Sequence, residues 1–100
     1  MHNLRPLRKL NKANISIQGS EHHYSIPRAY LDNLEDYKAL EIALFTKNNV
    51  WINPRKSIIM RSYPNLQELL EYYEEDNNPV GHYVPLHLVM DLIKWLNKGE

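Results

Sequence analysis

The chain of 100 residues contains no cysteine, which excludes disulfide bridges and thiolate metal sites. It has no run of about 18 apolar residues that could cross a membrane as a helix, and its first residues lack the apolar core of a signal peptide. A glycine-rich phosphate loop and a His-Glu-x-x-His motif are also absent. We therefore expect a cytoplasmic protein that is not an enzyme, with no membrane contact, cofactor, metal ion or small-molecule substrate.

Net charge is absent as well, because twelve basic residues balance twelve acidic ones. The balance conceals a division of the chain. Residues 1–56 hold nine basic and five acidic residues, and residues 57–100 hold three basic and seven acidic ones. A basic half beside an acidic half suggests two different partners, although a chance distribution of these charges would also produce such a division.

Residues 15–54 show the pattern of a strand, a loop, a second strand, a short helix and a β-hairpin. Apolar and polar residues alternate at 15–18 and again at 24–26, which is the period of a half-buried strand. Pro27 fits the first turn of a helix, with Ser25 as its candidate N-cap. The alternation returns at residues 40–45, and Asn48-Asn49 can take the positive φ that a two-residue hairpin turn requires.

The order and spacing of these elements resemble the AbrB/MazE family of swapped-hairpin antitoxins and transcription regulators. The motifs that carry the resemblance are Gly19-Ser20-Glu21, Ile26-Pro27, Tyr30-Leu31 with Leu34, and Ile52-Asn53-Pro54. The resemblance implies an α+β fold, in which a small swapped-hairpin β-barrel, formed by an intertwined homodimer, is followed by two C-terminal α-helices. Two chains would then share a core that the first 40 or so residues are too short to bury alone.

DNA binding is the role that the resemblance implies for residues 15–56, together with dimerisation. Ser16 and Ser25 stand where the family has basic residues, which weakens the usual DNA face. Residues 1–14 form a basic N-terminal arm that could replace it, because positive side chains bind phosphates without reading sequence; a frayed, solvated terminus is the alternative. The predicted DNA-binding residues are Arg5, Arg8, Lys9, Lys12 and Arg28.

Residues 57–100 form an acidic region with two predicted helices. Apolar residues at 66, 69, 70 and 73 recur at helical spacing, Asn65 and Glu68 have the spacing of a capping box, and a turn is expected at residues 76–79. Pro85 and Gly99 bracket the second helix. That helix is apolar on more than one face, so it must pack against its own domain, the other subunit or a partner.

In MazE-type antitoxins the acidic tail covers the RNA site of the toxin, a MazF-type endoribonuclease. The resemblance therefore implies a homodimeric antitoxin that binds operator DNA and inhibits such a toxin ribonuclease. Its predicted partner-binding residues are Leu66, Leu69, Leu70, Glu71, Tyr73, Glu74 and Trp95. The alternatives are an AbrB-type transcription regulator without a toxin, and a phage-type inhibitory interaction protein that has lost the basic face.

Overall fold

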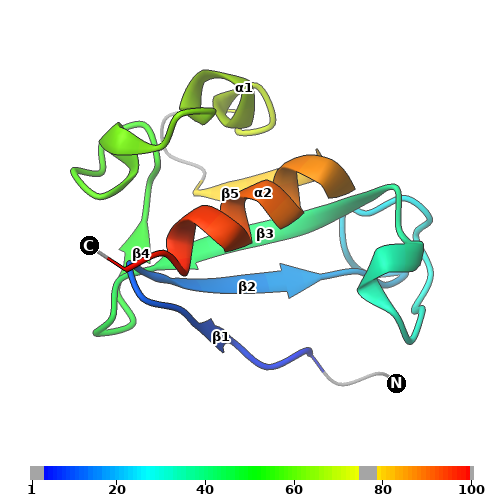
Figure 1. The fold of residues 1–100 in the computed structure, drawn as a ribbon. Helices are drawn as coiled ribbons and strands as arrows, with labels where there is room; N and C mark the ends of the chain where they lie inside the picture. The colour runs from blue at the N-terminus through cyan, green and yellow to red at the C-terminus, as the bar shows by residue number, and fades with distance from the viewer. Residues whose placement is uncertain (1–3, 75–78, 100) are drawn as a thin grey trace.

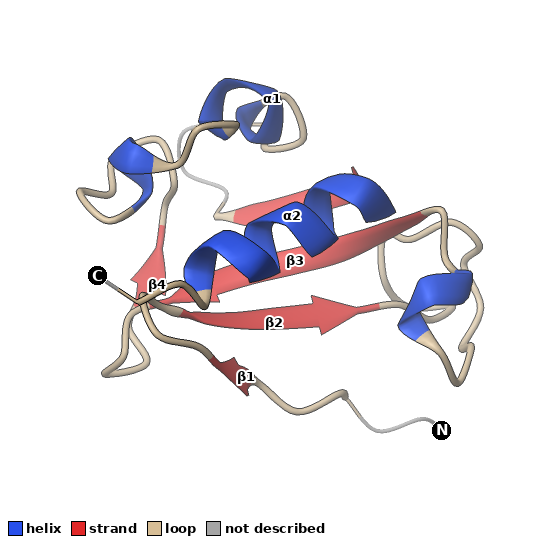
Figure 2. Cartoon of the chain, viewed as in Figure 1, coloured by secondary structure: helices blue, strands red, loops and turns tan. Residues whose placement is uncertain are grey.

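The computed structural model describes residues 4–74 and 79–99, which form one antiparallel sheet with a helix across one face (Figure 1). Figure 2 shows the strands and helices in the same view. The strands are β1 (Arg8–Lys9), β2 (Asn14–Gln18), β3 (Ala39–Phe45), β4 (Trp51–Ile52) and β5 (Val80–Pro85). The α-helices are α1 (Leu66–Leu70) and α2 (Leu86–Leu96), and the 3₁₀ turns are η1 (Leu34–Asp36) and η2 (Met60–Ser62).

Strand β3 is the centre of the sheet. It pairs with β2 along one edge, where Ile17 lies opposite Ile42. Along its other edge it pairs with β4 at one end and with β5 at the other, where Leu40 lies opposite Val84. The α+β class and the two C-terminal helices are thus confirmed. The predicted regions 15–56 and 57–100 contribute strands to the same sheet, because β5 pairs with β3.

The core lies between this sheet and α2. The alternation in β2 and β3 turns Ile15, Ile17, Ile42 and Leu44 toward the helix, and each is at most 2% exposed. Burial of a side chain of this size is worth about 1.5–3 kcal/mol relative to leaving it in water. One chain therefore has an interior of its own. The structure does not show the swapped-hairpin barrel. The second half of the chain, through β5 and the C-terminal helices, completes the core that the first half was expected to share with a second chain.

The helix expected from Pro27 is not formed. The Ile26-Pro27 peptide bond is cis, a geometry typical of a tight turn, and the hydroxyl of Ser25 donates a hydrogen bond to the carbonyl of Pro27 at 2.9 Å instead of capping a helix. The expected second strand is reduced to one bridge, between Ile26 and Ala39. Between β2 and β3 the chain is helical only in η1, where Asn33 caps the amide of Glu35 at 2.9 Å.

Two further local predictions need correction. The hairpin of β3 and β4 is confirmed and Asn49 has the expected positive φ of 64°, but the turn covers residues 46–50 because the amide of Thr46 bonds the carbonyl of Val50. Asn65 does not form the capping box, since its side chain donates to Asp91 at 2.8 Å. The turn predicted at residues 76–79 lies almost entirely outside the described residues. No helix within the described ranges has the length and apolar character needed to cross a bilayer.

The hydroxyl of Tyr37 holds the long connection between β2 and β3. It lies 2.9 Å from the carbonyl oxygen of Gly19 and 2.7 Å from that of Ala29, so it donates to one of them at a time, and it accepts a bond from the amide of Leu31 at 2.8 Å. The tyrosine ring packs directly on Gly19, where an added Cβ would stand 2.5 Å from the ring. Glycine is therefore required here by this close approach of the ring to the backbone.

We expect Tyr37→Phe to lower the free energy of unfolding by about 1–3 kcal/mol, because it leaves buried backbone groups without a partner. Tyr73→Phe is the matched control: the Tyr73 hydroxyl is buried and has no hydrogen-bond partner among the described residues. Its removal should leave stability unchanged or slightly raised. Urea denaturation of both variants checks this difference, and equal losses would contradict the role assigned to Tyr37.

Candidate functional site

The basic residues of the N-terminal arm do not share one face. Arg8 and Lys9 are neighbours on β1, opposite Ile15 and Asn14 respectively, so their side chains project to opposite sides of the sheet. Lys12 lies at the far end of α2, where its ammonium is 5.4 Å from the centre of the Trp95 ring. These three cations therefore do not form a continuous track for a phosphate backbone.

The two predicted arginines outside β1 contact their own chain. The Arg5 guanidinium donates to the carbonyls of Gly19 and Leu31 and lies 4.4 Å from the centre of the Tyr30 ring. The Arg28 guanidinium donates to the carbonyl of Glu21 at 3.3 Å and stands 5.4 Å from the ring of Tyr24. The structure thus gives Arg5 a part in holding the fold, and it does not bring the predicted DNA-binding residues together.

The predicted partner-binding residues divide into an inner and an outer group. Leu69 and Tyr73 are 0% and 2% exposed and belong to the chain's own core, while Leu66 and Leu70 are half-buried. A role for Leu69 and Tyr73 in contacting a partner is therefore not supported, because their surfaces are already used within the chain. The helix α2 likewise packs on its own sheet.

The outer group consists of carboxylates. Glu71 and Glu74 are exposed at the end of α1 and just beyond it. Glu68, which the sequence predicts as part of a capping box and not as a partner contact, is also exposed on α1, and we call these three residues the acidic ridge. Two histidines flank it, with His87 Nε2 3.2 Å from a Glu68 oxygen and His82 Nδ1 3.7 Å from a Glu74 oxygen. The buried side chains of Leu69 and Tyr73 attach the same segment to the core.

Arg55 fixes the end of this segment. Its guanidinium donates to the carbonyl of Leu70 at 3.0 Å and to that of Tyr73 at 2.5 Å. Leu70 is the last residue of α1 and Tyr73 lies three residues beyond it; a basic side chain is favourable near the carbonyls at the end of a helix. The backbone of the segment that carries the ridge is therefore held by Arg55, which comes shortly after β4 in the chain.

Trp95 takes part in a contact between α2 and the segment before α1. Its ring lies 5.1 Å from that of Tyr63. The Tyr63 hydroxyl donates to Asp91 at 2.6 Å, and the Asn65 amide donates to the same oxygen at 2.8 Å. These two hydrogen bonds, that from Tyr63 first, lower the pKa of Asp91. Trp95 is half-buried in this contact, so only part of its ring is available to a partner.

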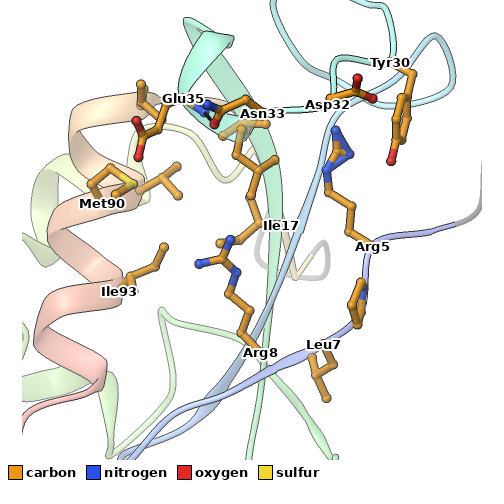
Figure 3. Close-up of a pocket in the computed structure, with 15 residues that line it drawn as sticks. Arg5, Leu7, Arg8, Ile17, Tyr30, Asp32, Asn33, Glu35, Met90 and Ile93 are labelled. Atoms are coloured by element: carbon orange, nitrogen blue, oxygen red, sulfur yellow. Dashed lines mark hydrogen bonds between the residues drawn. The ribbon is translucent and has the colours of Figure 1, made fainter.

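A groove of about 550 Å³ lies beside α2 (Figure 3). One wall is the extended segment 5–8, the other is the segment 30–35 that leads into η1, and α2 closes the third side. Apolar and polar surface contribute almost equally to its lining, and the apolar part includes Ile17, Leu34, Met90 and Ile93. The volume falls within the range of about 300–1,000 Å³ that is usual for ligand-binding pockets.

The groove carries charges of both signs at its rim. Arg8 belongs to one wall, and Asp32 and Glu35 belong to the other. Within the part of the chain that the structure describes, these three side chains have no hydrogen-bond or ion-pair partner. Sequence reasoning missed the groove because three separate segments build it and none of them carries a recognisable motif.

Comparison with known proteins gave no match: no family model, no curated protein and no solved structure is significantly similar to this chain. The acidic ridge and the groove therefore stand on their own geometry.

The pH dependence of stability should report on Asp91. Because its pKa is lowered in the folded chain, the hydrogen bond from Tyr63 stabilises the protein above the ordinary pKa of aspartate, about 3.9, and that contribution is lost as the pH falls through the folded pKa. Tyr63→Phe should thus cost more stability near about pH 6 than near about pH 2.5. Urea denaturation at both pH values measures this, and Tyr73→Phe should show no such pH-dependent difference.

Alanine substitution of Arg5 and of Arg8 should have different effects on stability. We expect Arg5→Ala to lower the free energy of unfolding by about 1–3 kcal/mol, because part-buried carbonyls lose their donor. Arg8→Ala, whose side chain is exposed and has no partner among the described residues, should change it by no more than about 0.5 kcal/mol. Thermal and urea denaturation give both values, and the reverse order would show that Arg5 does not hold the fold.

Proposed function

We propose that this chain is a non-catalytic inhibitor of the antitoxin type that its sequence resembles, and that it binds a cationic, RNA-binding surface of a toxin ribonuclease through the acidic ridge. The observation that carries the proposal is the placement of Glu68, Glu71 and Glu74. They are exposed, whereas the apolar side chains of the same segment are buried. A ridge held in place before binding loses less conformational entropy when the complex forms.

Inhibition of this kind requires occlusion and no chemistry. An RNA-binding site is lined by positive charge to attract phosphates, and carboxylates of matching spacing complement it electrostatically. The segment that carries the ridge has no basic residue of its own, because no lysine or arginine occurs between residues 62 and 93. Arg55, which does approach α1, is directed to backbone carbonyls.

The complete antitoxin function would also include a homodimer and operator DNA. In this proposal DNA contact falls to Arg8 and Lys9, which are exposed on the edge strand β1, while Arg5 has internal partners. Because the arm residues point in different directions, the inhibitory role has more support than the DNA-binding role. The same consideration favours the phage-type inhibitory protein over an AbrB-type regulator as the alternative.

The test uses the full chain as bait in its native host, because α1 and α2 pack on the sheet and a fragment would lose that support. We expect the wild-type chain to capture a ribonuclease and the purified complex to cleave RNA more slowly than the free enzyme. Glu71→Lys should weaken inhibition at least about tenfold, which corresponds to about 1.4 kcal/mol. Lysine at the end of α1 is compatible with the helix dipole, so the fold should persist.

Asp36→Lys is the matched control, because Asp36 is also exposed and the charge change is the same. It should leave capture and inhibition unchanged. The proposal is wrong if the captured proteins include no ribonuclease, or if Glu71→Lys and Asp36→Lys reduce inhibition to the same extent.

A further inference from the structure

The face of the sheet that carries α2 is covered unevenly. The helix α2 packs on β3 and β5, and α1 contacts β5 and η2. Figure 1 shows β1 and β2 below α2, with no helix of the described residues in front of them. The groove beside α2 occupies this part of the sheet. The inner face of β2 is itself buried, since Ile15 and Ile17 are 0% and 2% exposed, so the surface left open on this side is the groove between α2 and the segments 5–8 and 30–35.

The flank of α2 that borders the groove is apolar. Leu86, Met90 and Ile93 follow one another at helical spacing along it, and all three line the groove. Met90 is 44% exposed, although Leu86 and Ile93, which precede and follow it along this flank, are half-buried. Leu7 and Leu34, on the opposite walls, are also half-buried. An apolar surface that continues across three segments and is rimmed by charge is typical of a binding groove.

The exposed charges on the rim give this groove a direction. Arg5, the other cation of the lining, is bonded to carbonyls of its own chain and lies over the Tyr30 ring. Figure 3 shows Arg8 reaching in from β1 beside Ile93, while Glu35 and Asp32 lie on the segment at the other side, with Glu35 beyond Met90. These side chains have no partner within the described residues, so they are available to an occupant. An occupant that fits must be apolar on one side, with positive charge near Glu35 and negative charge near Arg8.

We infer that the groove binds a short amphipathic α-helix of a partner protein. Its apolar stripe lies on Met90 and Ile93, in the manner of other helices that bind in grooves. Its N-terminal end and basic side chains face Asp32 and Glu35, and its C-terminal end and acidic side chains face Arg8. The helix macrodipole favours the same direction, because it is positive at the N-terminus and negative at the C-terminus. Two arginines and two carboxylates line the groove, so it lacks the excess of positive charge that a nucleic-acid site requires.

This surface is separate from the acidic ridge. None of the three ridge residues lines the groove, and the helix inferred here does not depend on which protein the ridge binds. The groove would therefore give the chain a second point of attachment, either to another part of the same partner or to a different protein.

The test is a selection from a displayed library of amphipathic helices of about 15 residues, the length at which isolated helices become stable enough to use. The apolar stripe is fixed and the flanking positions are randomised, and the immobilised target is the full chain. We expect selected peptides to carry basic residues toward the N-terminus and acidic residues toward the C-terminus. Fluorescence anisotropy then gives dissociation constants for the chain and its variants, and Met90→Lys should abolish binding.

Charge reversal provides the decisive comparison. Arg8→Glu and Glu35→Lys should each weaken binding at least about tenfold, and Arg8→Glu should bind best to peptides whose acidic end is replaced by lysine. The matched controls are Lys9→Glu, whose side chain projects to the other face of the sheet, and Asp36→Lys, which neighbours Glu35 but does not line the groove. The inference is overturned if the selected peptides show no charge direction, if Lys9→Glu weakens binding as much as Arg8→Glu, or if Met90→Lys has no effect. The variant Glu71→Lys should bind these peptides normally, which separates this result from that on the ridge.

Discussion

The phenolic hydroxyl of Tyr37 is the contact on which the shape of this molecule depends. The connection from β2 to β3 contains a single short 3₁₀ turn and one bridge, so its own backbone hydrogen bonds are few. One side-chain oxygen within reach of Gly19, Ala29 and Leu31 replaces them. Arg5 joins the same point from the N-terminal segment, since its guanidinium lies 3.4 Å from that oxygen. The two walls of the groove are therefore held together at one place.

Features that depend on local periodicity could be predicted from the sequence. The alternation of apolar and polar residues located β2 and β3 because the pleat of a strand imposes it, and Pro85 marked the start of α2 because proline is tolerated there. The cis bond before Pro27 could not be predicted in this way, because cis and trans forms of such a bond differ by only about 0.5–1 kcal/mol and tertiary contacts decide between them. Asn65 was misassigned for a related reason, since a partner distant in sequence, Asp91, competes with the local cap.

The two candidate sites differ in the same way, since one depends on local sequence and the other on tertiary contacts. Two carboxylates of the acidic ridge, Glu71 and Glu74, could be predicted as partner contacts, because the periodicity of the apolar residues places them on or just beyond the polar side of a helix; Glu68 was predicted only as part of a capping box. The groove could not, because Arg8, Glu35 and Met90 come together only when the sheet has formed. The dispersal of the basic arm was equally hidden: Arg8 and Lys9 are adjacent in sequence, but their strand turns them to opposite faces. The net charge of residues 1–14 therefore shows that the arm is basic, but it does not show in which directions the basic side chains point.

The beginning of the chain and the end of α2 are joined by hydrogen bonds, from the amide of Lys12 to the carbonyl of Leu96 at 2.8 Å and from the side chain of Asn11 to the carbonyl of Asn97 at 2.5 Å. The strand β1 directly precedes Asn11 and Lys12 in the chain, so the groove wall that carries Arg8 is attached next to the last turn of the helix. If the last turn of α2 is unwound, by shortening the chain or by attaching a bulky fusion there, these hydrogen bonds are lost and the segment 5–8 is held less firmly beside the groove. Any measurement of the groove is thus sensitive to how the carboxyl end of the chain is treated.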